Sequence, residues 1–220
     1  MTYICAEVGS THNGYLSYAK ELVDICANIG CDAVKFQLFD KDSEYAKVNI
    51  PVPYYWMYEL KEYGIKKNYP ITITASVFDK KALEVLLELG VPWVKFAYSQ
   101  SDKWEWQAEV CNAGKKAFVS SDCMTRAKVL KNKSVVNLYC IPEYPITKLV
   151  SFEDVFDEYD YDGFSDHTLG YAQTIKAVQA GAEFIEKHIT LPYNDVTCPD
   201  SFFALKPKKF EDMVKTIRGL

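Results

Sequence analysis

Three histidines are present in the chain, and each follows or closes a short apolar segment typical of a β-strand. They are His12, His167 and His188. Neutral imidazole is the commonest protein ligand of a catalytic divalent metal ion. We interpret His167 and His188 as a pair that binds one metal ion, with Glu186, Asp166 or water completing the coordination. The alternative is that each imidazole only makes structural hydrogen bonds. For His12, contact with substrate and ordering of the first loop both remain open.

Two lysines occupy equivalent positions in two similar segments. Lys35 and Lys95 each lie between valine and phenylalanine in the sequence V-K-F. Because side chains alternate along a strand, apolar neighbours that face the helices leave both ammonium groups facing inward. An uncompensated inward charge is expensive. Either an anionic ligand such as a phosphate or carboxylate compensates the two lysines, or they form structural ion pairs with Glu7 or Glu186.

The elements that must position these residues alternate along the whole chain. Apolar segments predict strands at residues 3–8, 33–38, 71–75, 93–97, 117–120, 135–140, 163–165 and 183–188. Amphipathic segments predict helices at residues 15–29, 54–66, 80–89, 103–113, 125–131, 152–159, 171–180 and 208–217. The repeat G-x-x-x-V-K-F at residues 30–36 and 90–96 indicates repeated helix–glycine–strand units, and therefore parallel strands with right-handed crossovers.

Eight such units in 220 residues predict a compact α/β fold, a (β/α)8 TIM barrel that spans residues 1–220 as one domain. An open doubly wound sheet is the structural alternative, but the chain has no G-x-G pair of the kind that binds dinucleotides. In a barrel the active site lies at the C-terminal strand ends, where the histidines and lysines above are expected. Residues 41–53 are expected to form a loop over this mouth.

Composition restricts the classes of partner. The formal net charge is -5, and the only arginines are Arg126 and Arg218, which argues against nucleic acid as the main partner. No apolar run reaches the ~18 residues of a membrane-spanning helix. None of the seven cysteines forms a C-x-x-C pair. We therefore expect a reduced, cytoplasmic protein without a disulfide framework.

Five segments resemble signatures of the sialic acid synthase (N-acetylneuraminate synthase) family, in the same order. They are A-E-V-G-S-T-H-N-G at residues 6–14, A-V-K-F-Q at 33–37, Y-P at 144–145, S-D-H-T-L-G at 165–170 and I-E-K-H at 185–188. The resemblance runs over nearly the whole chain. It implies a barrel that joins phosphoenolpyruvate to the open-chain aldehyde of an N-acetylated hexosamine-like aldose. The implied products are phosphate and a 2-keto-3-deoxy sugar acid, either sialic acid or a related nonulosonate.

The same resemblance implies roles for individual residues. His167 and His188 match the family's ligands of Mn²⁺ or Mg²⁺, and Lys35 and Lys95 match lysines that hold phosphoenolpyruvate. Glu7 is the candidate for proton handling or for orienting the attacking water. The catalytic set expected from the resemblance is therefore Glu7, Lys35, Lys95, His167 and His188. The substrate-binding set is Gln37, Thr74, Gln100, Ser120, Tyr144, Ser165, Glu186 and Asp200, of which Gln37, Tyr144 and Asp200 match positions that face the sugar.

Several features depart from the family pattern. The chain ends at Leu220, so we expect the family's C-terminal antifreeze-like domain to be missing. The segments that differ are Tyr98-Ser99-Gln100 in place of S-G-E, Cys198-Pro199-Asp200-Ser201 in place of G-P-D-H, and Pro142 or Glu143 in place of an asparagine. These differences concern recognition of the sugar. They keep two alternatives open, another metal-dependent barrel lyase or phosphatase, and a non-catalytic barrel that binds an anionic sugar. The family tends to form dimers, so a homodimer is one expected assembly.

Overall fold

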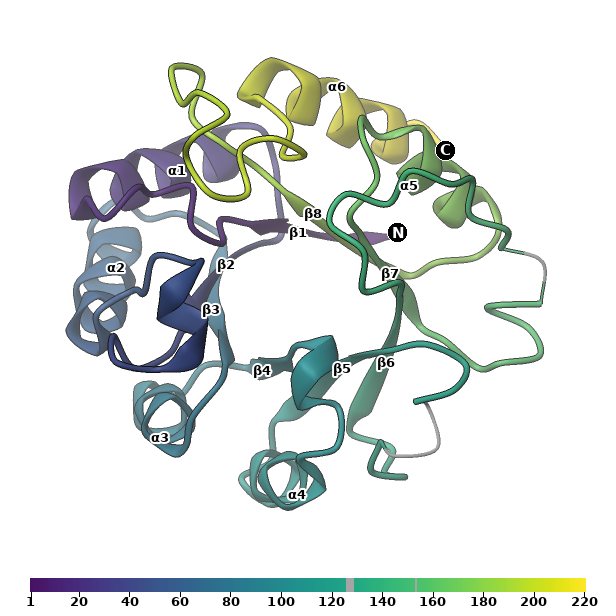
Figure 1. Cartoon of the computed structure of the whole chain (residues 1–220), viewed down its shortest axis with the longest axis horizontal. Helices are drawn as coiled ribbons and strands as arrows, with labels where there is room; N and C mark the ends of the chain where they lie inside the picture. Colours follow the sequence, from purple (N-terminus) through teal and green to yellow (C-terminus); the bar gives the residue numbers. More distant parts are fainter. Residues whose placement is uncertain (126–128, 153) are drawn as a thin grey trace.

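Eight parallel strands close into a barrel in the computed structural model, in the order in which they follow along the chain (Figure 1). The structure describes residues 1–125, 129–152 and 154–220. The strands are β1 (Tyr3–Glu7), β2 (Ala33–Leu38), β3 (Thr72–Val77), β4 (Trp93–Phe96), β5 (Lys116–Ser121), β6 (Val135–Cys140), β7 (Gly163–Asp166) and β8 (Phe184–His188). Each strand pairs with the next, and β1 closes the ring by pairing with β8. The predicted barrel is confirmed, and the open doubly wound sheet is excluded.

Helices surround the ring of strands on its outside (Figure 1). In the described part of the chain they are α1 (Leu16–Asn28), α2 (Tyr54–Lys66), α3 (Lys80–Leu89), α4 (Trp104–Asn112), α5 (Ala172–Gln179) and α6 (Pro207–Arg218), with the short 3-10 helices η1 (Glu44–Lys47) and η2 (Tyr98–Gln100). Helix α3 shows the local logic. The Asp79 carboxylate accepts a hydrogen bond from the backbone N–H of Ala82 at its start, and Gly90 ends it with a φ of 69°.

Two of the predicted helices, over residues 152–159 and 125–131, are not among the helices of the described structure. Residues 154–158 form hydrogen-bonded turns instead of the helix expected over 152–159. Asp154 has a φ of 66°, in the left-handed region, and its carbonyl accepts from the N–H groups of both Glu158 and Tyr159. A left-handed residue near the start prevents the right-handed helix from forming there. The helix expected over 125–131 includes residues 126–128, which lie outside the described residues.

Aromatic side chains fill the barrel interior at its N-terminal end. Tyr3 stacks on Phe184 with ring centroids 5.3 Å apart, and Phe118 lies 4.7 Å from both Phe184 and Trp93. These rings belong to a buried cluster separate from the larger apolar layer between strands and helices. Because the rings close one end of the barrel, polar inward side chains farther along the strands face only the other end.

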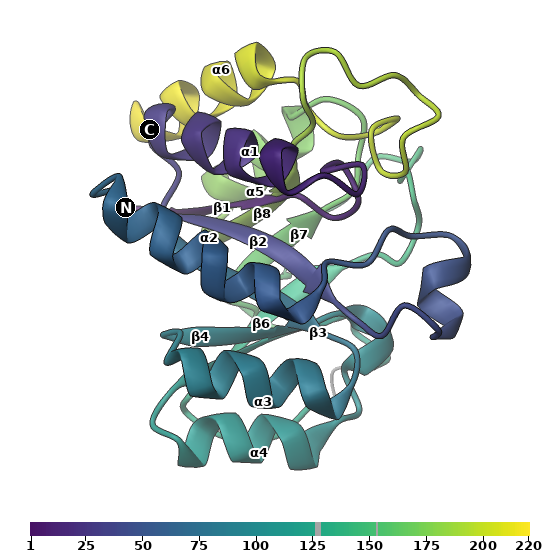
Figure 2. The same ribbon diagram turned by 90° about the vertical axis from the view of Figure 1, so that its left-hand side faces the viewer.

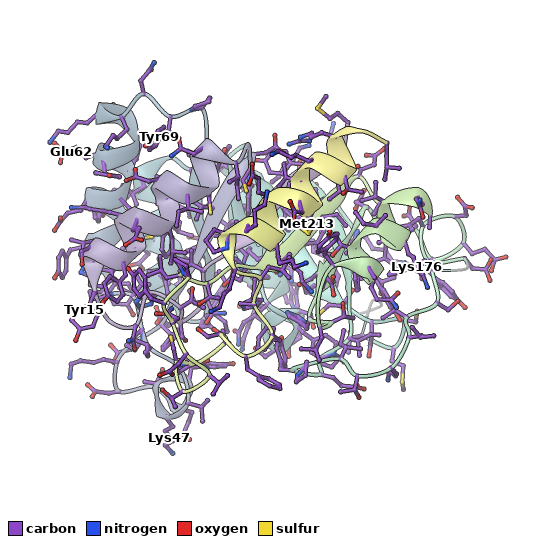
Figure 3. The ribbon with its side chains drawn as sticks, turned by 90° about the horizontal axis from the view of Figure 1, so that it is seen from above. Tyr15, Lys47, Glu62, Tyr69, Lys176 and Met213 are labelled. Carbon is purple, nitrogen blue, oxygen red and sulfur yellow. The ribbon has the colours of Figure 1, made fainter. Side chains whose placement is uncertain are left out.

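The segments at that other end project beyond the strands. Figure 2 shows the segment with η1, between β2 and α2, and the segment between β8 and α6 extending from the same end of the barrel. Lys47 of η1 lies at this end, whereas Glu62 and Tyr69 lie at the opposite end (Figure 3). Residues 41–53 therefore lie at the C-terminal mouth, as predicted. Of the described helices, none combines the length and apolar character required to cross a bilayer.

Candidate active site

A cavity of about 490 Å³ opens at the C-terminal end of the barrel. All eight strands contribute to its wall, because each ends with at least one inward-facing residue. These strand residues are Glu7, Lys35, Gln37, Ser76, Lys95, Ser120, Cys140, Ser165, Glu186 and His188. His167, one residue beyond β7, also lines the cavity. The structure thus brings together the five residues predicted as catalytic.

Two lysines and two carboxylates form a buried charge cluster on the cavity wall. The Lys35 ammonium contacts the Glu7 carboxylate, donates to the Ser76 hydroxyl at 2.7 Å and lies 3.5 Å from Glu186 Oε2. The Lys95 ammonium lies 3.7 Å from Glu186 Oε1. All four charged residues are at most 5% exposed. The inward direction predicted for both lysines is correct, and the ion pairs that the sequence left as an alternative are present.

Serine hydroxyls complete the surroundings of this cluster. Lys95 donates to Ser120 Oγ at 2.7 Å, and Ser165 donates to Glu186 Oε1 at 2.8 Å. Both serines line the cavity, as predicted. An anion that entered beside the lysines would meet two ammonium groups and nearby hydroxyl donors, which is a suitable environment for a phosphate or carboxylate.

Burial and neighbouring charges shift the pKa values of Glu7 and Glu186 in opposite directions. Burial raises the pKa of Glu7 to about 7, with attraction to Lys35 only partly opposing it and the charge of Glu186 adding to it. Burial also disfavours ionisation of Glu186, but attraction to Lys35 and Lys95 outweighs burial and lowers its pKa to about 2. Two carboxyl groups with separated pKa values suit different tasks: one exchanges a proton near neutral pH, and the other stays ionised.

The two histidines proposed as metal ligands lie next to each other at the ends of β7 and β8. The ring centroids of His167 and His188 are 5.6 Å apart. Burial lowers the pKa of His167 to about 4 and that of His188 well below its ordinary value, so both imidazoles are neutral at pH 7. Among the described residues, Nδ1 of His188 is buried without a hydrogen-bond partner. Two neutral imidazoles on one cavity, of which His188 has an unpaired ring nitrogen, fit two ligands of a metal ion.

Among the described residues, a third protein ligand does not accompany this pair. Within residues 1–125, 129–152 and 154–220, no group of three His, Cys, Asp or Glu side chains is placed to hold one metal ion. Glu186 lies between the two lysines, and the Asp166 carboxylate is bound to Lys187 at 3.1 Å on the other side of the strand. The expectation that Asp166 completes the coordination is therefore wrong, because strand alternation turns Asp166 away from the cavity. A metal ion here would rely on water or substrate for its remaining ligands.

The other predicted substrate contacts divide into two groups. Gln37, Tyr144 and Asp200 line the cavity. Thr74 and Gln100 do not line it, which corrects the expectation that both face the substrate. Thr74 lies one inward position below Ser76 and donates to the Trp93 carbonyl at 2.8 Å. The Gln100 amide donates at 2.7 Å to the hydroxyl of Tyr45, which itself lines the cavity, so Gln100 supports the wall from behind.

His12 lies outside the cavity lining. Its Nδ1 accepts a hydrogen bond at 3.1 Å from the backbone N–H of Gly14, and its ring packs edge-on against Trp56 with centroids 5.5 Å apart. These contacts favour the second of the two roles left open for His12, ordering of the first loop.

Three aromatic residues that were not predicted as part of the site line the outer part of the cavity. Tyr45 lies 4.6 Å from Phe78 and Phe39 lies 5.7 Å from Phe78, measured between ring centroids, and all three line the cavity. Phe39 directly follows the expected end of the second strand at residue 38, so its position beside the mouth was a signal available in the sequence, whereas Phe78 lies three residues beyond the expected end of the third strand at residue 75 and directly follows the observed β3. Cys140 also lines the cavity, with its Sγ 3.9 Å from Nδ1 of His167.

Comparison with known proteins places this site in a family. The family model described as NeuB matches residues 46–220. The chain belongs to the NeuB family. An uncharacterized protein of Methanocaldococcus jannaschii is 32% identical, over 99% of this chain and 70% of its own length. The N,N'-diacetyllegionaminic acid synthase of Campylobacter jejuni is 28% identical, over 100% of this chain and 76% of its own.

Solved structures agree with this membership. The chain is similar to the N-acetylneuraminic acid synthetase of Leptospira borgpetersenii, solved with citrate, with a TM-score of 0.85 and 25% identity over 99% of this chain and 83% of that one. A 3-deoxy-D-arabino-heptulosonate 7-phosphate synthase of Thermotoga maritima shares the fold at a TM-score of 0.73 and 11% identity, covering 99% and 86%. The resemblance inferred from the sequence signatures is confirmed, and with it the prediction of an enzyme of the sugar-acid synthase type.

Proposed function

We propose that this NeuB-family chain condenses phosphoenolpyruvate with an aldose of the N-acetylhexosamine type and releases phosphate. The product is a 2-keto-3-deoxy sugar acid. One observation carries the proposal: Lys35, Lys95, His167 and His188 line a single cavity at the catalytic end of the barrel. This chemistry requires cations that bind a small, dense anion and, beside them, neutral ligands for a metal ion. The two lysines and the two histidines offer these groups.

The anion site lies between the two lysines. A phosphoenolpyruvate bound there would take hydrogen bonds from Lys35 and Lys95 in place of the carboxylates that contact them now. Ser120 Oγ, 2.7 Å from Lys95, and the Ser165 hydroxyl offer further donors on the same wall. Charge-assisted hydrogen bonds of this kind are roughly twice as strong as neutral ones, which favours the doubly charged phosphate over a neutral ligand.

The proposed reaction forms one carbon–carbon bond and breaks one carbon–oxygen bond. The methylene carbon of phosphoenolpyruvate attacks the aldehyde carbon, and the aldehyde oxygen becomes a hydroxyl by gaining a proton. Water then adds to the neighbouring carbon, which loses phosphate and becomes the ketone. Glu7 is suited to hold the proton that this water gives up, because burial places its pKa at about 7. The backbone N–H of Gly9 donates to Glu7 Oε1 at 3.0 Å and orients the carboxyl group.

We also propose that His167 and His188 hold a divalent ion, Mn²⁺ or Mg²⁺. Both rings are neutral at pH 7 and line the same cavity as the lysines. When bound, such an ion supplies Lewis-acid polarisation of the aldehyde oxygen. The residues of this chain contribute the two imidazoles and the shape of the cavity around them.

The aldose would lie on the outer part of the cavity. Gln37 and Tyr144 offer polar groups there, and Asp200 accepts from the backbone N–H of Ser10 at 2.8 Å, which fixes its carboxylate. Tyr98 occupies the position of the family's serine, and its hydroxyl donates to Asp122 at 3.0 Å. The hydroxyl is therefore bound to the segment after β5, and the ring adds apolar surface to the wall.

Phosphate release under defined conditions tests the proposal. The enzyme is incubated with phosphoenolpyruvate, Mn²⁺ and a panel of N-acetylhexosamines and shorter aldoses, and products are identified by mass spectrometry. We expect phosphate release that depends on both the metal and the aldose, together with a product heavier than the aldose by the pyruvate unit. Phosphate release without a carbon–carbon bond would instead identify a phosphatase, and no release with any aldose would contradict the proposal.

A further inference from the structure

A second buried ion pair lies directly behind the two histidines. Asp166 is the last residue of β7 and pairs in register with Lys187 of β8. Their side chains are both 0% exposed, and the Lys187 ammonium lies 3.1 Å from Asp166 Oδ2. Because side chains alternate, this pair faces the helix layer, while the next residue on each segment, His167 and His188, faces the cavity.

The two histidines are not held equally well by the barrel itself. His188 is the last residue of β8, pairs with Glu7 of β1, and its carbonyl accepts from Leu205 at 2.9 Å. His167 follows the end of β7 and lies outside the strand ladder. Its carbonyl accepts from the Ile146 N–H at 3.0 Å, and its ring packs on that of Tyr144 with centroids 4.2 Å apart. The position of His167 therefore depends on contacts from outside the strand ladder and on contacts made by its neighbours in the chain.

Asp166 and Lys187 provide those contacts by holding the peptide units on either side of Thr168. Asp166 Oδ1 accepts from the Thr168 N–H at 2.7 Å, and the Lys187 ammonium donates to the Thr168 carbonyl at 2.5 Å. Thr174, at the start of α5, donates its hydroxyl to Asp166 Oδ2 at 2.5 Å. His167 thus lies between Asp166 and Thr168, two residues that this network holds to β8 and to α5.

We propose that the Asp166–Lys187 pair is a positioning device that fixes the His167 imidazole relative to that of His188 and thereby sets the affinity for a divalent ion. The metal part of this inference rests on the proposed function. Neither residue touches the cavity, so both act through the histidines beside them. Groups that orient metal ligands in this way typically change metal affinity by ~10–100-fold when they are lost.

The test replaces both charges at once, in Asp166→Leu/Lys187→Met. The double variant leaves no unpaired charge, although the Thr168 and Thr174 groups lose their partners and stability falls. A purely structural pair predicts this loss of stability with unchanged Mn²⁺ binding. A positioning pair predicts Mn²⁺ binding weakened by ~10–100-fold, measured by electron paramagnetic resonance without phosphoenolpyruvate or aldose. If the double variant does not fold, Asp166→Asn/Lys187→Met removes both charges, keeps an acceptor for the Thr168 N–H and tests the contact of Lys187 with the Thr168 carbonyl by the same measurement.

The chain contains a control ion pair at the opposite end of the barrel, whose side chains are 24% and 33% exposed. Asp32 accepts from the Ile4 N–H at 2.7 Å, and Arg218 contacts Asp32 at 2.6 Å and donates to the Thr2 carbonyl at 2.6 Å. This pair repeats the same bonding pattern far from the histidines. Asp32→Leu/Arg218→Met should leave Mn²⁺ affinity unchanged.

A second readout separates failure of this inference from failure of the proposed function. With only three histidines in the chain, imidazole ¹⁵N resonances can be assigned in each variant. We expect the His167 signals to broaden or split in the Asp166/Lys187 double variant and to stay sharp in the control. Wild-type protein that binds no Mn²⁺ would contradict the metal site, and the His167 signals would still decide the positioning role. Unchanged His167 signals, or unchanged Mn²⁺ affinity in a binding wild type, would overturn the inference.

Discussion

Replacing each buried lysine of the charge cluster with methionine should separate anion binding from support of the fold. Methionine has a similar length and fills apolar space, so loss of the charge is the main change. In Lys35→Met, Glu7 and Glu186 lose the cation that both contact. Removing one partner of a buried ion pair costs about 3–5 kcal/mol of unfolding free energy. We therefore expect a severely destabilised protein.

Lys95→Met should be milder for stability. Glu186 loses the Lys95 ammonium at 3.7 Å but keeps its contacts with Lys35 and with the Ser165 hydroxyl, and Ser120 loses its hydrogen bond from Lys95. Leaving one buried polar group unsatisfied costs about 1–3 kcal/mol. Both variants should nevertheless lose phosphoenolpyruvate-dependent activity. Truncation of a buried hydrogen-bonded charge pair costs about 2–5 kcal/mol, or roughly 30-fold to several thousand-fold in kcat/KM.

Urea unfolding and phosphate release measure the two effects separately. Lys176→Met, on the exposed side of α5, is the control and should change neither quantity. Where Lys35→Met does not fold, Glu7→Gln/Lys35→Met should recover part of the stability, because one unpaired charge is removed. Equal stability of the two single lysine variants would refute the view that Lys35 is the shared cation. Wild-type kcat/KM for phosphoenolpyruvate in either variant would refute anion contact by that lysine.

Three further predictions follow from the site and the barrel. Because the pKa of Glu7 is about 7, kcat/KM in a phosphate-release assay should rise with pH through about 7 as the Glu7 carboxylate forms. Glu7→Gln should flatten this rise. A rise that persists in Glu7→Gln excludes Glu7 as its cause. His167→Ala should weaken Mn²⁺ binding by more than ~100-fold in electron paramagnetic resonance while phosphoenolpyruvate still binds in calorimetry. Gly163→Ala should cost about 1–3 kcal/mol in urea unfolding, because its Cβ would overlap the Phe184 carbonyl, whereas Gly219→Ala meets no atom closer than 3.5 Å and should be neutral.

Local patterns predicted most of the barrel. The predicted strands agree with the observed ones to within two residues at each end. Strand bounds are set locally, by the β-branched residues of the segment and by the glycine that ends the preceding helix. Alternation around Lys35 and Lys95 correctly predicted that both face inward. The helix expected over 152–159 shows the limit of such patterns. Its apolar spacing was helical, but the left-handed backbone of Asp154 depends on interactions that spacing does not reveal.

The site was predicted less completely, because loop paths and packing depth are not local properties. Gln100 follows β4 at a position that suits the mouth, yet the segment carrying Tyr45 covers it. Thr74 faces the barrel interior, but it lies one inward position below Ser76 and therefore does not line the cavity. The role of Asp166 was accessible from the sequence: it and Lys187 each precede a histidine, and a lysine that faces the helix layer needs an anionic partner nearby.

The buried lysines are already neutralised before any substrate arrives, since two carboxylates accompany two ammonium groups. On the proposed function, binding of phosphoenolpyruvate would therefore be a counterion exchange inside the barrel, in which the incoming oxygens replace the carboxylates at the lysines. The affinity for phosphoenolpyruvate would then be the difference between two attractions of the lysines, one for the substrate oxygens and one for the carboxylates of Glu7 and Glu186. A small difference would allow inorganic phosphate to leave the same cluster.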